Sequence, residues 1–417
     1  MSPLKISWKS LWSKPLSAAL NILLIAFGTG ILTILLLASA QISQKLENNS
    51  KDVDLVVGAK GSPLQLVLSS IYHIDFPTGN IPLKDAMELA RNPLVKKAVP
   101  LALGDNYNGI RIVGTDSNFV GLYKLKLSEG KLWKENFETT IGADVAKSLQ
   151  LKVGDTFHGA HGLTGSSDVH DSHPYVVSGI LEPQGNVTDN LILTNIASVW
   201  EMHEESDEHH AQDEAVDDHD HDHEHKSDEP ALHEADEDRE LTSLLIQYRS
   251  PMSVAIFPRM VNESTNMQAA SPAQESTRLF SLIGVGVDTL QWFAVLIMGI
   301  AAISVFINLY NSLKERSYDL AIMRTLGASR FKLFVIIISE GIILTFAGTI
   351  IGIALGHAVL HLIGSYQDTD QARLTGMVLL YDEIYLFAAG LAIGIFAAVI
   401  PATQAYRSNI SKILSKN

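Results

Sequence analysis

The densest group of potentially reactive side chains in this sequence is a run of histidines and carboxylates at residues 201–240. It contains the heptapeptide HDHDHEH, from His219 to His225. Imidazole and carboxylate groups are ligands for zinc, copper and nickel, and an extended chain with histidine at every second position places its imidazoles on one side. We therefore predict weak binding of zinc or another divalent metal by His209, His210, His219, His221, His223 and His225.

The composition of the same run argues against a packed structure. Residues 201–240 hold 19 of the 46 acidic side chains and only 2 of the 31 basic ones, with few apolar residues. Such a segment buries too little apolar surface to offset the entropy of folding, so we predict a disordered external loop. An inert solvated loop is the alternative to metal capture, and a metal as transported cargo is a third hypothesis.

The net charge of −15 therefore describes this insertion, because basic residues slightly exceed acidic ones in the rest of the chain. No pattern typical of nucleic-acid binding is present, so we expect no nucleic-acid partner.

Two smaller groups of histidines also have spacings that permit metal binding. His357 and His361 lie one helical turn apart in an apolar run, and packing is the interpretation that we favour there. The other group lies in a stretch rich in glycine and serine, where we favour polar turn residues; it consists of His158, His161, His170 and His173.

No pattern typical of an enzyme accompanies these residues. The sequence has no H-E-x-x-H motif, no phosphate-binding G-x-x-x-x-G-K-[ST] motif and no Ser-His-Asp order. Because it contains no cysteine, disulfides and thiolate metal sites are excluded. We predict no catalytic residues and no resident cofactor in this chain.

Four apolar runs place the remaining residues relative to a membrane. They cover residues 16–39, 290–313, 334–363 and 384–405, and each reaches the roughly 20 helical residues that a bilayer core requires. The first run is longer than the roughly 7 to 15 apolar residues of a cleaved signal peptide, so we predict a retained span. The predicted fold class is an α-helical membrane protein with four transmembrane helices and a large α+β extracytoplasmic domain inserted between helices 1 and 2.

Basic residues at the ends of these runs predict the orientation. Only Arg373 lies in the connection at residues 364–383, whereas the other side has Lys5, Lys9, Lys14, Lys314, Arg316, Arg324, Arg330, Lys332, Arg407, Lys412 and Lys416. Lysine and arginine concentrate in cytoplasmic loops. We therefore predict cytoplasmic termini, a cytoplasmic tail at residues 406–417, and external positions for residues 41–287 and 364–383.

Residues 1–15 are predicted to form an amphipathic helix in the cytoplasmic interface. Their apolar residues recur at helical spacing opposite Lys5 and Lys9; they are Leu4, Trp8, Leu11 and Trp12. A simple positively charged flank is the alternative.

Residues 314–332, with the sequence KERSYDLAIMRTLGASRFK, form a short basic connection between the second and third runs. We expect a short helix there that Gly327 ends as a left-handed C-cap. A helix with one apolar stripe can dock in the groove of a partner. The residues of this stripe are Leu320, Ile322, Met323 and Leu326.

Small and ionisable residues stand out within the runs. Glycines at four-residue spacing allow helices to approach closely, either within this chain or at a dimer seam; they are Gly348, Gly352, Gly356, Gly390 and Gly394. Glu340 is an ionisable group within the third run, which indicates either a function or pairing with a basic neighbour near the interface.

The external region has a mixed α and β pattern. We predict strands at residues 110–113, 175–181, 190–194 and 241–248 from short apolar or β-branched runs. Helices are predicted at residues 144–149, 254–261 and 277–290, and the last of these continues into the second span.

Three segments of this region resemble the periplasmic core domain of MacB-type ABC transporter permeases. They are VGTDSNFVGLYKLKLSEGKLW, TIGADVAKSLQLKVGDTF and YVVSGILEPQGNVTDNLIL. Residues 315–329 resemble the coupling loop of FtsX-like permeases, although Asp319 stands where that family often has glutamate. The resemblance covers nearly the whole chain in the same order: one span, an external domain and three spans.

The resemblance implies a permease subunit in the bacterial inner membrane that works with a separate cytoplasmic ATPase, which binds ATP and Mg²⁺. It assigns the ATPase contact to Arg316, Leu320, Met323, Arg324, Leu326, Gly327 and Ala328. The implied activity is export or mechanotransmission by a permease dimer or pseudo-dimer, with a periplasmic adaptor or outer-membrane channel as further partners. Lipoprotein extraction, activation of cell-wall hydrolases and metal-responsive regulation are the alternatives.

Overall fold

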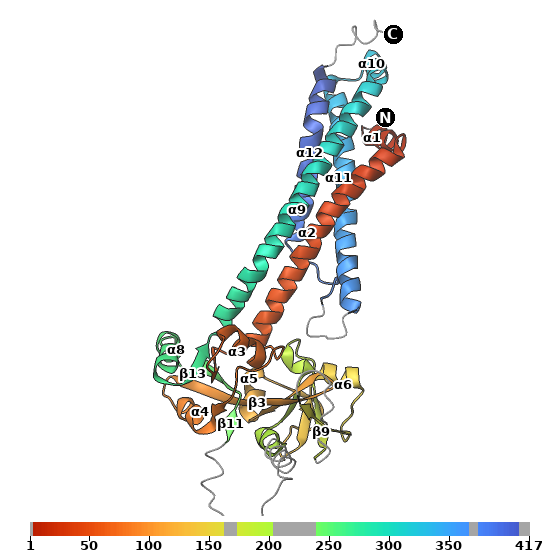
Figure 1. Ribbon diagram of the computed structural model, residues 1–417. Helices are drawn as coiled ribbons and strands as arrows, with labels where there is room; N and C mark the ends of the chain where they lie inside the picture. Colours follow the sequence, from red (N-terminus) through yellow and green to blue (C-terminus); the bar gives the residue numbers. More distant parts are fainter. Residues whose placement is uncertain (1–2, 162–172, 203–238, 367–373, 408–417) are drawn as a thin grey trace, which may run out of the picture. The chain divides into compact units, whose positions relative to one another are not determined.

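The computed structural model describes residues 3–161, 173–202, 239–366 and 374–407 (Figure 1). The chain divides into two compact units. Residues 1–43 and 282–417 form the first, which we call the membrane unit, and residues 44–281 form the second, the sheet unit.

Helices make up the membrane unit. They are α1 (Pro3–Trp12), α2 (Pro15–Ser50), α9 (Pro272–Glu315), α10 (Ser317–Thr325), α11 (Arg330–Ser365) and α12 (Glu383–Arg407). Within the described residues, four of them are long and apolar enough to cross a membrane: α2, α9, α11 and α12. They contain the four apolar runs, so the predicted four-span fold class is confirmed.

Helices α2 and α9 are longer than the apolar runs inside them. In α2 the helix continues past residue 39 through the polar sequence QISQKLENNS, which has helix-forming residues and no proline. Residues 44–50 of α2 and 272–281 of α9 consequently belong to the sheet unit.

Glycines on α11 and α12 bring the helices of the membrane unit together. A Cβ at Gly348 would lie 2.7 Å from the Cβ of Ile25 on α2, and a Cβ at Gly352 would overlap the hydroxyl of Thr29. Gly390 and Gly394 on α12 meet threonine hydroxyls of α11 in the same way. Close packing at such positions needs small residues, and here the packing is within the chain.

The sheet unit is built around one mixed sheet. Its strands follow the order β13-β1-β12-β3-β4-β10-β6-β9-β5, with β7 beside β9 and β8 beside β3, and β2 and β11 form a separate pair. The strands are β1 (Leu55–Ala59), β2 (Ile81–Pro82), β3 (Val95–Tyr107), β4 (Ile110–Thr115), β5 (Leu127–Gly130), β6 (Glu138–Ile141), β7 (Thr156–Phe157), β8 (Ala160–His161), β9 (Tyr175–Leu181), β10 (Ile192–Asn195), β11 (Glu240–Leu241), β12 (Ser243–Tyr248) and β13 (Met267–Ala270).

Helices cover this sheet and complete its cores. They are α3 (Pro63–Ser70), α4 (Leu83–Ala90), α5 (Ser117–Tyr123), α6 (Ala143–Leu149), the 3₁₀ helix η1 (Val187–Asn190) and α8 (Ser253–Ser264). On β1, Val56 packs in one hydrophobic core, while its neighbours Leu55 and Val57 pack in another. This alternation is the period-two pattern of a strand buried on both faces.

Local signals explain most of these elements. Asn108 and Gly109 have φ angles of 51° and 80°, as the two-residue turn between the antiparallel strands β3 and β4 requires. The predicted strands at 110–113 and 175–181 lie within β4 and β9, and the helices predicted at 144–149 and 254–261 lie within α6 and α8.

One predicted strand begins later than expected. The prediction for residues 190–194 is displaced by two residues because Asn186 caps η1, its side chain accepting a hydrogen bond from the amide of Thr188. The extended conformation therefore starts only after Asn190, and the strand is Ile192–Asn195.

Candidate functional site

The candidate site is the connection from α9 to α11, which has a defined turn at the C-terminal end of α10. Gly327 has a φ of 101°, and its amide donates to the carbonyl of Arg324 at 3.1 Å. The amide of Ala328 donates to the carbonyl of Met323 at 2.9 Å. These two bonds form a Schellman motif, so the predicted left-handed C-cap at Gly327 is confirmed.

Ser329 then begins the next helix. Its hydroxyl accepts a hydrogen bond from the amide of Lys332 at 3.2 Å, as an N-cap does. The tetrapeptide Leu-Gly-Ala-Ser thus contains both the end of one helix and the start of the next, which holds α10 in a defined position on α11.

The predicted apolar stripe of α10 is divided between two sides of the helix. Leu320 and Met323 pack against the core formed by Leu333, Ile336 and other residues of α11 and α12. Leu326, by contrast, is 82% exposed. The predicted docking stripe thus has two half-buried residues, Leu320 and Met323, that also pack on the chain's own helices, and its role as a docking surface stays a prediction.

The apolar residues that α10 exposes are not the same as those of the predicted stripe. We call their surface the α10 face; it consists of the exposed Tyr318, Ile322 and Leu326, to which we add the exposed Phe331 near the start of α11. Sequence reasoning missed Tyr318 and Phe331, although Tyr318 stands four residues before Ile322, a spacing that places both on one side of a helix. Gly327 lies beside this face, exposed, and Ala328 is half-buried.

Arg316 is half-buried and contacts other residues of its own chain. Its Nη1 lies 3.8 Å from Oε1 of the buried Glu340. The same guanidinium donates to the backbone carbonyl of Ser10 at 3.1 Å and to the hydroxyls of Ser10 and Ser13. Glu340 therefore pairs with a basic neighbour, which is the second of the two interpretations proposed for it.

Helix α1 and the start of α2 are tied to the same place. The hydroxyl of Ser7 donates to the carbonyl of Ile336 at 2.9 Å and lies 2.6 Å from the hydroxyl of Ser339. Lys14 forms an ion pair with Glu315. Contacts between residues more than 300 positions apart thus link α1 to α11, and Lys14, between α1 and α2, to the last residue of α9.

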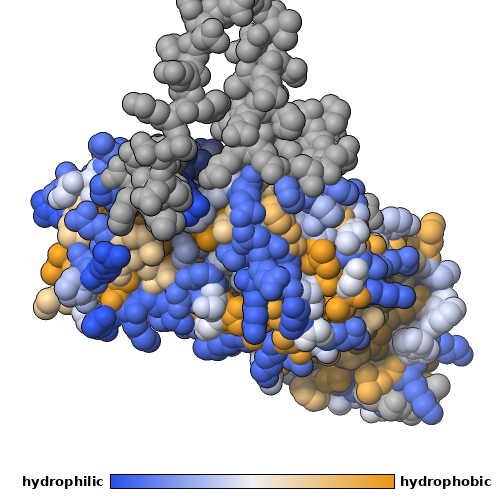
Figure 2. All heavy atoms as spheres, turned by 90° about the horizontal axis from the view of Figure 1, so that it is seen from below, coloured by the Kyte–Doolittle hydropathy of each residue, from blue (hydrophilic) through white to orange (hydrophobic). Residues whose placement is uncertain are grey.

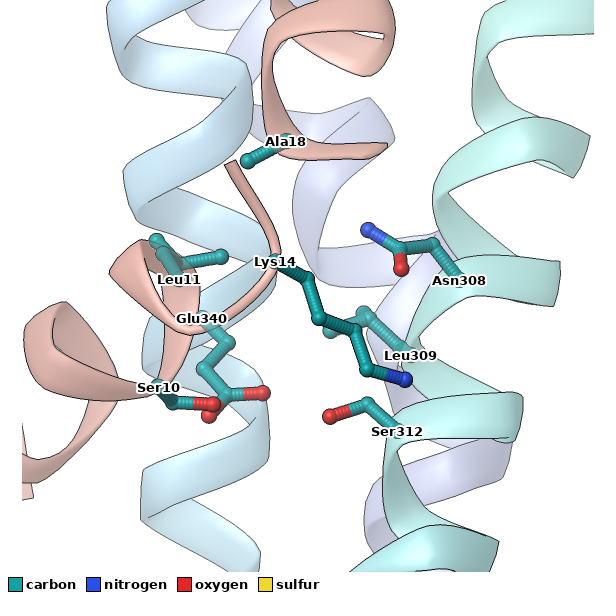
Figure 3. A pocket seen from close by; sticks show the side chains of 8 residues that line it. All are labelled: Ser10, Leu11, Lys14, Ala18, Asn308, Leu309, Ser312 and Glu340. Atoms are coloured by element: carbon teal, nitrogen blue, oxygen red, sulfur yellow. The ribbon is translucent and has the colours of Figure 1, made fainter. Parts of the chain in front are cut away.

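A small cavity lies between these elements (Figure 3). Its lining side chains are Ser10, Leu11, Lys14, Ala18, Asn308, Leu309, Ser312 and Glu340. It has room for about one water molecule. The cavity is polar enough to hold such a water and too small for a nucleotide or an organic cargo.

At the other end of the bundle, His357 is used in packing. Its Nδ1 lies 2.7 Å from the carbonyl oxygen of Gly376, and its Nε2 lies 3.2 Å from Oε2 of Glu383. Glu383 also accepts a hydrogen bond from the amide of Leu380 at 2.9 Å. These contacts fix the segment before α12 against α11, as the packing interpretation expects.

The predicted metal ligands of the histidine-rich run lie outside the described residues. Of the second histidine group, His173 stacks on Phe137 with a ring separation of 4.8 Å. Among the residues that the structure describes, no three histidine or acidic side chains come together as metal ligands. On the uncovered part of the face shown in Figure 2, hydrophilic and apolar residues are intermingled.

Comparison with known proteins covers both units. Residues 18–255 match the family described as the MacB-like periplasmic core domain, and residues 292–410 match the FtsX-like permease C-terminal family. A search of curated proteins found no match.

Two solved structures are similar to the chain at low identity. The periplasmic region of MacB from Actinobacillus actinomycetemcomitans is 11% identical, with a TM-score of 0.33, and covers 57% of this chain and 98% of its own. The extracellular domain of the noncanonic ABC-type transporter YknZ from Gram-positive bacteria is 12% identical, with a TM-score of 0.30, and covers 52% of this chain and 99% of its own.

Proposed function

Because this chain belongs to the family of ABC transporter permeases with a MacB-like periplasmic core domain and an FtsX-like C-terminal region, we propose that it couples a cytoplasmic ATPase to an extracytoplasmic movement. The ATPase is a separate chain that binds ATP and Mg²⁺, because this sequence has no phosphate-binding loop of its own. In this proposal the ends of the bundle near α1, α10 and the C-terminus are cytoplasmic, and the sheet unit is periplasmic.

The observation that carries the proposal is the α10 face. Aromatic and aliphatic side chains are exposed there on a short helix that ends in a rigid Schellman turn. A membrane span explains exposed apolar residues by contact with lipid, but α10 is only nine residues long and has charged residues at both ends. An amphipathic helix of this kind binds by placing its apolar side chains in the groove of another protein.

The positive charge around the α10 face leads us to expect acidic residues at the rim of the partner's groove. Lys314, Arg330 and Lys332 flank it, and Arg324 lies within the helix. Rim charges of one sign steer a partner of the opposite sign and fix its orientation. Of the seven residues first assigned to the ATPase contact, we retain Arg324, Leu326, Gly327 and Ala328, and we assign Arg316, Leu320 and Met323 to intrachain packing.

Movement would pass to the sheet unit through α2 and α9. Each is one uninterrupted helix that has residues in both units, and a hydrogen-bonded helix transmits displacement along its axis better than a loop does. A permease dimer, a periplasmic adaptor and an outer-membrane channel remain parts of the proposal, with export or mechanotransmission as the outcome.

The test is a change at Leu326 that affects only the exposed surface. We expect Leu326→Glu to reduce recovery of the ATPase with the purified permease at least tenfold, because a carboxylate would be buried without a partner in an apolar groove. Leu379→Glu is the matched control, because Leu379 is 80% exposed against 82% for Leu326 and lies in the segment before α12, away from α10.

Both variants should insert and purify in equal amounts. Recovery of the ATPase with Leu326→Glu at the wild-type level would remove the α10 face from the coupling site. If both variants recovered equally little ATPase, the defect would be general, and this result would also count against a specific contact at Leu326.

A further inference from the structure

Helix α1 packs one side on the bundle and leaves an apolar side outward. Ile6 and Leu11 pack against the cores of the membrane unit, beside the buried Ser7 and Ser10. On the other side, Trp8 and Trp12 are 57% and 67% exposed. Two tryptophan side chains in such a position need an apolar environment, which the described residues do not supply.

The outward residues form a single face. Leu4, Trp8 and Trp12 follow one another at four-residue spacing, which aligns them along the helix, and the two tryptophan rings lie 6.3 Å apart. Lys9 is exposed beside them. The apolar part and the lysine occupy adjacent arcs, as in helices that lie in the plane of a membrane interface.

Three observations select lipid as the occupant of this face. Only two residues separate α1 from α2, and the first residues of that span, Leu16 and Leu20, are themselves exposed, so the face continues the surface that the span presents to lipid. Tryptophan is enriched at the level of the headgroups. Lysine at that level is attracted to anionic phospholipids.

The inner side of α1 is in contact with the proposed coupling segment. Ser10 accepts hydrogen bonds from Arg316, which also pairs with Glu340, and Arg316 is the residue directly before α10. Ser7 holds α1 on α11 through Ile336 and Ser339. A shift of α1 away from the bundle would remove the oxygen atoms that orient the Arg316 side chain.

We propose that α1 binds anionic phospholipid of the adjoining leaflet through Leu4, Trp8, Trp12 and Lys9, and that lipid-bound α1 holds Arg316 in place at the start of α10. The lipid contact is independent of the proposed function. Its regulatory consequence rests on that function, since it concerns the segment proposed to meet the ATPase.

The first experiment measures the lipid contact in the permease alone. The full chain is reconstituted in nanodiscs that contain phosphatidylglycerol with brominated acyl chains, which quench tryptophan fluorescence on contact. Trp292 lies exposed in the second span, so all proteins also have Trp292→Phe. We expect Trp8→Phe/Trp12→Phe to lose at least half of the quenching that the protein with Trp292→Phe alone shows. Equal quenching with and without the two changes in α1 would overturn the lipid contact.

The second experiment measures whether lipid holds α1 on the bundle. The chain has no cysteine, and the Oγ atoms of Ser7 and Ser339 lie 2.6 Å apart, so Ser7→Cys/Ser339→Cys reports docking by disulfide formation. We expect crosslinking in phosphatidylglycerol nanodiscs to be faster than in phosphatidylcholine ones. Adding Lys9→Gln should slow it about fivefold in phosphatidylglycerol, because one lysine near an anionic surface is worth about 1 kcal/mol.

Lys51→Gln is the matched control, because Lys51 is also an exposed lysine but lies in the sheet unit. Crosslinking that does not depend on the headgroup or on Lys9 would overturn the proposal for anionic lipid. Neither measurement uses the ATPase, so a failure here is distinguishable from a failure of the coupling proposal.

Discussion

At the scale of single residues, the environment of a side chain decides its role more than its type does. Arg316 and Leu326 are both in the short basic segment, yet one pairs with Glu340 inside the bundle and the other is exposed. The sequence predicts that Arg316 contacts a partner. In the structure its guanidinium donates hydrogen bonds to Ser10 and Ser13 of its own chain.

His73 is a buried titratable residue of the sheet unit, and its burial should make the stability of the unit depend on pH. Neither of its ring nitrogens has a hydrogen-bond partner among the described residues. Burial, and secondarily the positive charge of Arg111, lower the pKa of His73 from 6.5 to about 3. The folded unit therefore keeps this imidazole neutral at a pH at which the unfolded chain would protonate it.

Stability should consequently fall as the pH falls below 6.5. Between that value and about 3, only the unfolded state binds the proton, so His73 alone lowers the free energy of unfolding by up to about 1.4 kcal/mol per pH unit. His73→Asn removes this group and tolerates the positive φ of 54°. We expect its melting temperature to fall less than that of the wild type between pH 7 and pH 5, whereas parallel losses would contradict this assignment.

At the scale of the elements, close helix contacts organise the membrane unit. Helix α11 meets α2 at Gly348, Gly352 and Gly356, and it meets α12 at Gly390 and Gly394. Since these positions are filled by helices of the same chain, they are not available as the seam to a second copy. A permease dimer would have to use another surface.

We expect Gly352→Ala to destabilise the membrane unit by roughly 1–3 kcal/mol, the usual effect of overpacking. The added Cβ would overlap Thr29 Oγ1 and lie 2.6 Å from the carbonyl oxygen of Ala26. Gly299→Ala is the matched control in α9, because its Cβ would have no neighbour within 4 Å. Unfolding in a sodium dodecyl sulfate titration measures the stability of both variants. Equal unfolding midpoints for Gly352→Ala and Gly299→Ala would show that α2 and α11 are not closely packed at Gly352.

At the scale of the whole molecule, four spans and one inserted sheet unit make up a family architecture. If all four helices span the membrane, their even number predicts that both termini lie on one side. The sheet unit follows the first span and precedes the second, so we expect it on the side opposite the termini and α10. The distribution of basic residues predicts that the side of the termini is cytoplasmic.

Labelling of introduced cysteines tests this orientation, and the absence of native cysteine leaves no background. Ala255 in the sheet unit and Thr325 at the end of α10 are both exposed. We expect a membrane-impermeant maleimide to label Ala255→Cys in intact spheroplasts and Thr325→Cys only after the membrane is opened. Labelling of both in intact spheroplasts would contradict the topology.

The sequence by itself determined the features that depend on neighbouring residues. The four apolar runs, the Schellman turn at Gly327 and the strands of β4 and β9 follow from composition, local spacing and the conformational freedom of glycine. Each of these features depends on a few residues or on one helix length, so it can be predicted without knowledge of the fold.

Only the tertiary structure decided which side of each element is covered. Periodicity shows that α10 has apolar residues, but α11 and α12 determine that Leu320 and Met323 pack inward while Leu326 stays exposed. Likewise, Arg316 pairs with Glu340 and Ser10 because α1 and α11, more than 300 residues apart, meet at the end of α9. Such contacts depend on how distant segments pack, and no local pattern records them.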